Sequence, residues 1–177
     1  MDNQIHFVHV TGEYPYLKEL LDIRDEAFPE NERSSDRNLD AYINNTRFTT
    51  YAVEDNERLV GFTVLINIDE DYSYLLYLAI GQQFRSKHYG SIVLQNLINN
   101  ELKGKALFGC IEALLPESEN YTQRVKRAEF YTRNGMTVLD KVFCKEPVGS
   151  FQFFCSDSKV DFETLKQKML MLAASSK

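Results

Sequence analysis

The sequence has 177 residues, of which 44 % are hydrophobic and 26 % charged. These proportions are ordinary for one soluble globular domain and exclude a chain dominated by disorder. The formal net charge of -6 argues against nucleic acid or an anionic membrane surface as a partner. It suits a cationic substrate such as an amine, although solubility alone also explains it.

Three widely spaced cysteines, Cys110, Cys144 and Cys155, form no CxxC pair and no zinc-like spacing with the histidines, so we expect no metal site. Their odd number favours a reduced, cytoplasmic protein with buried thiols. The first residues lack a basic stretch followed by an apolar one, and the longest apolar run, 75–80, is too short to span a bilayer. We therefore expect neither a signal peptide nor a membrane segment.

The N-terminal half predicts three strands and two helices, namely strands at 5–10, 48–53 and 59–66 and helices at 15–28 and about 35–43. Pro15 suits the first turn of its helix. Asp55-Asn56 is a hairpin signal between the second and third strands. Gly61 inside the third strand indicates a bulge or a close backbone contact.

The C-terminal half predicts four strands, at 72–80, 107–114, 136–144 and 148–155. It also predicts three helices, at 89–102, from Asn120 or Thr122 to 134, and at 158–174. The first of these strands is apolar on both faces and should be buried on each side. Gly104 and the pair Asn134-Gly135 suit helix ends, and Ser158 can cap the last helix. The order β-α-α-β-β-β-α-β-α-β-β-α predicts an α/β fold, a mixed sheet flanked by helices.

One strand-loop-helix segment has the features of an anion site. The buried strand ends at Ile80, and the next helix opens near His88, so free backbone N–H groups and the positive helix end point at one spot. Arg85 and Lys87 add charge, and Gly90 lets a phosphate approach the backbone. The alternative is a plain turn with a solvated basic loop.

The segment 78–91 resembles motif A of the GNAT superfamily of N-acetyltransferases. Its pattern is (Gln/Arg)-x-x-Gly-x-(Gly/Ala). Arg85 matches the first position and Gly90 the last, and His88 stands where the family most often has glycine.

The segment 127–136 resembles motif B of the same superfamily, a helix that carries Phe130-Tyr131 and ends in Asn134-Gly135 before an apolar residue. One helix and one strand lie between the two motifs, as in the family. The resemblance covers nearly the whole chain.

The resemblance implies the GNAT acyl-CoA N-acyltransferase fold in one domain over 1–177, with a common core at about 4–156 and an extra C-terminal helix at about 158–174. It also implies direct transfer of an acetyl group from acetyl-CoA to a primary amine in a ternary complex. Neither a metal nor a nucleophilic cysteine is needed. Acetyl-CoA and an amine-bearing acceptor are then the partners, with no nucleic acid and no membrane.

The resemblance further implies where acetyl-CoA binds. The parallel strands before and after motif A splay apart in this family and make a slot for the pantetheine arm. Backbone groups after the strand bind the pyrophosphate, and a backbone N–H of the 72–80 strand steadies the oxyanion. The expected donor-site residues are Leu78, Ala79, Ile80, Arg85, Ser86, Lys87, His88, Tyr89, Gly90 and Ser91.

Four further residues are candidates for the chemistry. In the family the tyrosine at Tyr131 protonates the departing thiolate, and the alternative is aromatic packing. Glu112 is a candidate base because a carboxylate inside an apolar strand is unusual; the alternative is an ion pair or an exposed strand end. Tyr77 and Glu32 are candidates for the acceptor site. The alternative for Tyr77 is packing, and the alternative for Glu32 is a solvated loop.

Two other classes of function stay open. One is a module of the same fold that binds CoA without transfer and acts as a binding or regulatory protein. The other is an interaction or structural role through the apolar stripe of the 158–174 helix, so the protein is a monomer or a homodimer. The sequence leaves the acceptor open between a small amine and a protein amine.

Overall fold

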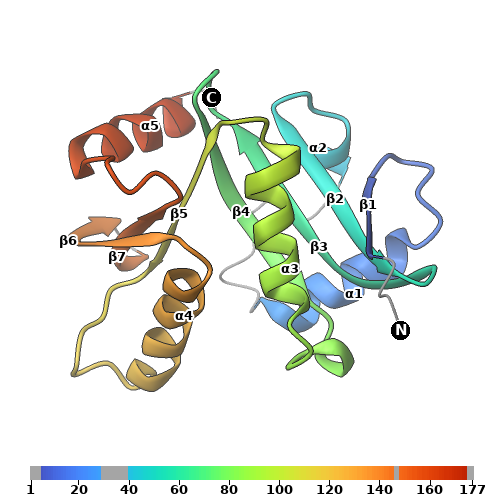
Figure 1. Ribbon diagram of the computed structural model, residues 1–177, viewed down its shortest axis with the longest axis horizontal. Helices are drawn as coiled ribbons and strands as arrows, with labels where there is room; N and C mark the ends of the chain where they lie inside the picture. The colour runs from blue at the N-terminus through green and yellow to red at the C-terminus, as the bar shows by residue number, and fades with distance from the viewer. Residues whose placement is uncertain (1–4, 29–39, 146–147, 175–177) are drawn as a thin grey trace. The chain divides into compact units, whose positions relative to one another are not determined.

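The computed structural model of the protein describes residues 5–28, 40–145 and 148–174, and Figure 1 shows the path of the chain. These residues belong to two compact units. Unit 1 comprises Met1–Asn67 and Leu75–Val93, and unit 2 comprises Ile68–Tyr74 and Leu94–Lys177. Apart from two short additional helical turns, the elements follow one another in the predicted order.

Seven strands form one mixed sheet in the order β1-β2-β3-β4-β5-β7-β6. Their bounds are β1 Ile5–His9, β2 Phe48–Asp55, β3 Arg58–Asn67, β4 Tyr72–Ile80, β5 Ala106–Glu112, β6 Thr137–Lys145 and β7 Gly149–Cys155. The pairs β1–β2, β2–β3, β5–β7 and β6–β7 are antiparallel. A parallel ladder joins residues 72–74 of β4 to residues 106–108 of β5, which confirms the predicted mixed sheet.

Two helices cover one face of the strands in unit 1. They are α1 (Leu17–Ala27) and α2 (Asp40–Ile43), and the predicted start of the second, near residue 35, lies outside the described residues. Buried side chains from both helices, from β2, β3 and β4 and from the connection between β1 and α1 form one cluster: Val10, Tyr14, Leu20, Tyr42, Ala52, Phe62, Val64, Tyr77 and Ala79. Burial of this apolar face stabilises unit 1.

The β2–β3 hairpin confirms two sequence predictions. Asn56 and Glu57 form its two-residue turn with φ values of 50° and 63°, the left-handed pair that matches the twist of the two strands. The pairing register shifts beyond Val53, which lies opposite Gly61. A β-carbon at Gly61 would lie 2.4 Å from the carbonyl oxygen of Ala79, so this position has both a bulge and a close backbone contact.

Strand β4 is buried less completely than predicted. Its residues alternate between buried and half-buried along the whole strand. Tyr77 and Ala79 lie in the cluster under α1 and α2, whereas Leu78 and Ile80, on the other face, stay half-buried. The prediction of full burial on each side is therefore wrong for the second face, because both helices of the cluster pack against the first.

The helix after β4 ends in an irregular turn. Helix α3 (Tyr89–Asn96) passes into the π-helical turn η2 (Leu97–Glu101), which a continuous helical pattern does not predict. Gly104 follows with a φ of 93°, so the predicted glycine end of this helix is confirmed.

Strands β5, β6 and β7 of unit 2 have helices on both faces, α4 (Tyr121–Arg133) on one and α5 (Phe162–Ala174) on the other (Figure 1). Neighbouring residues of β7 face opposite ways, as alternation requires. Phe154 contacts Tyr131 of α4, whereas Phe153 contacts Phe162 of α5.

The C-terminal helix packs on its own unit. Leu165 is fully buried in a cluster with Phe108, Phe153 and Cys155, which favours simple packing for the predicted apolar stripe. The expected cap at Ser158 is wrong. Asp161 caps the helix instead, because its carboxylate accepts a hydrogen bond from the backbone N–H of Thr164 at 2.7 Å, the usual N-cap spacing. Among the described residues, every helix is too short or too polar to cross a membrane.

Candidate active site

The loop between β4 and α3 in unit 1 is the segment for which the sequence predicts an anion site. It begins with the 3₁₀ turn η1 (Gln82–Phe84). Ser86 and His88 both have a φ of 63°, and left-handed residues in such a loop turn successive N–H groups toward one concavity. The N–H groups of the first helical turn, Tyr89 to Ser91, add to the same end because they precede the first intrahelical bonds.

His88 occupies a position that favours glycine, as its left-handed φ of 63° indicates. We expect His88→Gly to be more stable than His88→Ala by about 1 kcal/mol, since a β-carbon is strained in this conformation. Thermal melting of the two variants should differ by roughly 2–4 °C. Lys87 is a control one residue earlier without a positive φ, and there alanine should be the more stable. A higher Tm for His88→Ala than for His88→Gly would contradict the strained geometry.

Both predicted cations of the loop contact residues of unit 1. The Nε of Arg85 donates to the carbonyl of Ile80 at 3.0 Å, and a terminal nitrogen lies 3.3 Å from the carboxylate of Glu26. The Lys87 ammonium lies 5.9 Å from the centre of the Phe84 ring. The side chain of Arg85 is 48 % exposed, so its charge remains accessible to a ligand.

The β2–β3 hairpin adds two residues to this loop. The hydroxyl of Tyr89 donates a short hydrogen bond to the carboxylate of Asp55, and this bond raises the pKa of Tyr89. The guanidinium of Arg58 lies 5.5 Å from the centre of the Phe84 ring. Sequence reasoning missed Asp55 and Arg58, since only the pairing of the strands brings them to the loop.

The two acceptor-site candidates differ in where they lie. Tyr77 is 5 % exposed and packs among the rings of Phe28, Tyr42 and Phe62, with ring centres 4.8, 6.1 and 6.4 Å away. It is part of the core of unit 1, and its role toward an acceptor stays a prediction. Glu32 lies outside the described residues.

Tyr131 lies in apolar surroundings in unit 2. Its ring stacks on that of Phe154, with centres 3.8 Å apart and an angle of 16° between the planes, and meets Phe130 edge-on. Burial raises the pKa of Tyr131 to about 12; Arg127 opposes this effect and Cys110 adds to it. The phenol is therefore protonated at neutral pH, a form that can donate a proton but cannot act as a base; its role in catalysis stays a prediction.

Glu112 lies at the end of β5 and binds three donors. Its Oε1 is 3.2 Å from Arg124 and 3.2 Å from Asn120, and its Oε2 is 3.0 Å from Arg127. Arg124 also donates to the carbonyl of Ala113 at 2.8 Å. This is the ion pair left open as the alternative in the sequence, and the role of Glu112 as a base stays a prediction.

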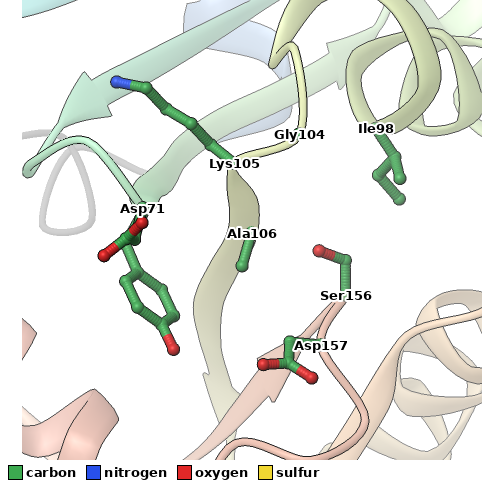
Figure 2. A pocket seen from close by; sticks show the side chains of 8 residues that line it. Asp71, Ile98, Gly104, Lys105, Ala106, Ser156 and Asp157 are labelled. Atoms are coloured by element: carbon green, nitrogen blue, oxygen red, sulfur yellow. The ribbon is translucent and has the colours of Figure 1, made fainter.

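A pocket of about 500 Å³ in unit 2 contains none of the predicted site residues (Figure 2). Its polar side chains hold the surrounding backbone. Ser156 accepts from the N–H of Leu107, Lys105 donates to the carbonyl of Asp69, and Asp157 accepts from the N–H of Lys159. These three side chains therefore bind backbone groups around the pocket.

Comparison with known proteins identifies the family. The sequence model of the Acetyltransferase (GNAT) family matches residues 17–136, which is more than half of the 177 residues. The chain belongs to the GNAT family of acetyltransferases. Its resemblance to this family, drawn from motifs A and B, is thereby confirmed.

Solved structures share the fold of this GNAT protein. A protein from Bacteroides thetaiotaomicron assigned to the GNAT family matches with a TM-score of 0.74 and 22 % identity, covering 93 % of this chain and 95 % of its own. An aminoglycoside 6'-N-acetyltransferase in complex with coenzyme A matches with a TM-score of 0.65 and 16 % identity, covering 88 % and 99 %. A GNAT acetyltransferase from Elizabethkingia anophelis with bound acetyl-CoA matches with 0.60 and 16 %, covering 89 % and 99 %. None of the curated proteins matches this GNAT chain in sequence.

Proposed function

We propose that this GNAT protein is an N-acetyltransferase that moves an acetyl group from acetyl-CoA to a primary amine. The observation that carries the proposal is the loop before α3, where the left-handed residues Ser86 and His88 turn backbone N–H groups toward one spot beside Arg85 and Lys87. Pyrophosphate is the anion that such a loop suits. Membership of the GNAT family supports the proposal. Two solved structures of the same fold, which contain CoA and acetyl-CoA, also support it.

The proposed reaction is direct transfer. The neutral amine nitrogen attacks the thioester carbon, and a backbone N–H of β4 steadies the oxyanion. The C–S bond breaks, the departing thiolate takes the phenol proton of Tyr131, and the amine loses its extra proton to a base or to water. The backbone of Ala79 and Ile80 pairs with the pantetheine arm, and Leu78 belongs to the same donor site. Residues 1–177 act as one cytoplasmic catalytic domain, as a monomer or homodimer.

A second candidate is a module of this family that binds CoA without transfer. One observation favours it: the carboxylate of Glu112 is held by Arg124, Arg127 and Asn120, which occupy three of its roughly four acceptor sites. A protein without a usable base would bind the donor and release no thiol.

Thermal melting with CoA, followed by a thiol-release assay with acetyl-CoA and a panel of amines, tests the proposal. We expect CoA to raise the Tm and at least one primary amine to release the free thiol. A raised Tm without release for every amine, protein amines included, supports the binding module. An unchanged Tm with saturating CoA and no thiol release contradicts both functions.

Glu112→Gln separates the two roles of this carboxylate. Because its oxygens are already bound by donors, we expect an anchoring role: the Tm falls by about 2–8 °C, as for a partly buried ion pair worth about 1–2 kcal/mol, and kcat stays within about threefold. Loss of a base would instead lower kcat by about 100-fold or more. Glu129→Gln, an exposed glutamate of α4, is the control and should change neither quantity.

A further inference from the structure

We propose that Phe154 is a positioning residue for Tyr131, and that Gly109 is glycine because the Phe154 ring needs its space. This inference rests on the proposed function, since it concerns how the proton donor is held. The two residues belong to neighbouring strands of unit 2 and are directly opposed in the β5–β7 ladder.

The contact between Phe154 and Tyr131 fixes the plane of the phenol. The ring centres lie 3.8 Å apart and the planes are within 16° of parallel. The other aromatic neighbour, Phe130, is adjacent in α4 and meets Tyr131 edge-on at 5.2 Å, so it moves with the helix. Phe154 is the partner that ties the phenol to the sheet.

Phe154 is itself held on both sides. It is 1 % exposed and is paired with Gly109 of β5 and Val138 of β6. A residue of an inner strand has its backbone fixed by two ladders. The orientation of the Tyr131 ring is therefore set by the sheet and not by α4 alone.

Gly109 makes room for this arrangement. A β-carbon at residue 109 would lie 2.4 Å from Cζ, 2.9 Å from Cε1 and 3.2 Å from Cε2 of Phe154. All three atoms belong to one rigid ring, so the ring as a whole would have to move. Any side chain at this position would therefore displace the ring on which Tyr131 stacks.

Phe153 provides a matched control on the same strand. It is fully buried and also stacks on another ring, that of Phe143, with centres 4.4 Å apart and planes at 20°. It faces α5 and not α4. Truncation of Phe153 thus removes a comparable core contact without touching Tyr131.

A double-mutant cycle on turnover tests the proposal in the full-length protein, with acetyl-CoA and the best amine of the panel. We expect Phe154→Leu and Gly109→Ala each to lower kcat by about tenfold or more, with the KM for acetyl-CoA within about threefold. In a Tyr131→Phe background the same changes should alter kcat by less than about twofold, because residues that act as a unit are not additive. Phe153→Leu should lower the Tm and change kcat by the same factor in both backgrounds. Phe154→Met replaces Phe154→Leu where the leucine variant does not fold.

Additive effects of Phe154→Leu and Tyr131→Phe on kcat, or an unchanged kcat in Phe154→Leu, would overturn the positioning role and leave the proposed function standing. An unchanged kcat in Tyr131→Phe alone would refute the proton-donor role and the positioning role with it. Absence of turnover in the wild-type protein with every amine would refute the transferase proposal itself.

Discussion

Tyr131→Phe is expected to lower turnover by about 100- to 10 000-fold, the range for loss of a general acid, while CoA affinity stays nearly unchanged. The change removes one oxygen and keeps the ring, so the stack on Phe154 at 3.8 Å is preserved. The thiolate then leaves without a proton donor. Steady-state kcat and a direct measurement of CoA binding separate the two effects.

The surroundings of Tyr131 allow its phenol to protonate a thiolate, provided that burial raises the pKa of both groups. In water a phenol is the weaker acid, with a pKa near 10 against about 8.5 for a thiol. Burial raises the pKa of Tyr131 to about 12, and burial also raises the pKa of the nearby Cys110 thiol to about 12. A CoA thiolate formed in similar apolar surroundings would be basic enough to accept the phenol proton.

The same shift sets the pH dependence. A raised pKa favours the protonated phenol in the folded state, so Tyr131 stays mostly protonated until the pH approaches its raised pKa of about 12. Loss of turnover below that pH is therefore not expected from its ionisation.

Tyr121→Phe is the control for Tyr131→Phe, since Tyr121 is the first residue of α4 and is 37 % exposed. Turnover of Tyr131→Phe equal to that of Tyr121→Phe would show that Tyr131 only packs.

Local sequence signals predicted the elements well. Asp55-Asn56 located the hairpin turn, and Asn134-Gly135 located the end of α4, where Gly135 has a φ of 83°. Both rest on backbone conformations that few residues adopt, so they are readable without tertiary structure. The start of the last helix was harder to predict, because Ser158 and Asp161 are both residue types that favour the N-cap position. The turn between them determines which one caps the helix.

The surroundings of the site residues were less predictable, because they depend on register. Alternation along β5 showed that Glu112 was an unusual carboxylate, but Arg124 and Arg127 reach it from α4. The stack of Phe154 on Tyr131 follows from the pairing of residues 109 and 154. A shift of one residue in that pairing would turn Phe154 to the other face of the sheet. The pattern of residues along the two strands does not show which register they adopt.

Gly61→Ala is expected to destabilise unit 1 and to weaken CoA binding. Its β-carbon would lie 2.4 Å from the carbonyl oxygen and 3.3 Å from the nearest backbone carbon of β4, in Ala79 and Ile80. Backbone of an inner strand cannot turn aside as a side chain does, so the strand must shift. Overpacking costs about 1–3 kcal/mol, which corresponds to a Tm lower by roughly 2–12 °C.

The shift falls on the two residues that we propose pair with the pantetheine arm, so CoA affinity should fall by about tenfold, or 1.4 kcal/mol. Gly12→Ala is the matched control because nothing lies within 4 Å of its β-carbon, and its Tm should be unchanged or slightly higher. A lower Tm with unchanged CoA affinity would place the arm away from Ala79 and Ile80. A decrease in both the Tm and the CoA affinity would show that donor binding depends on the close approach of β3 and β4, because Gly61 itself is not among the residues expected to touch CoA.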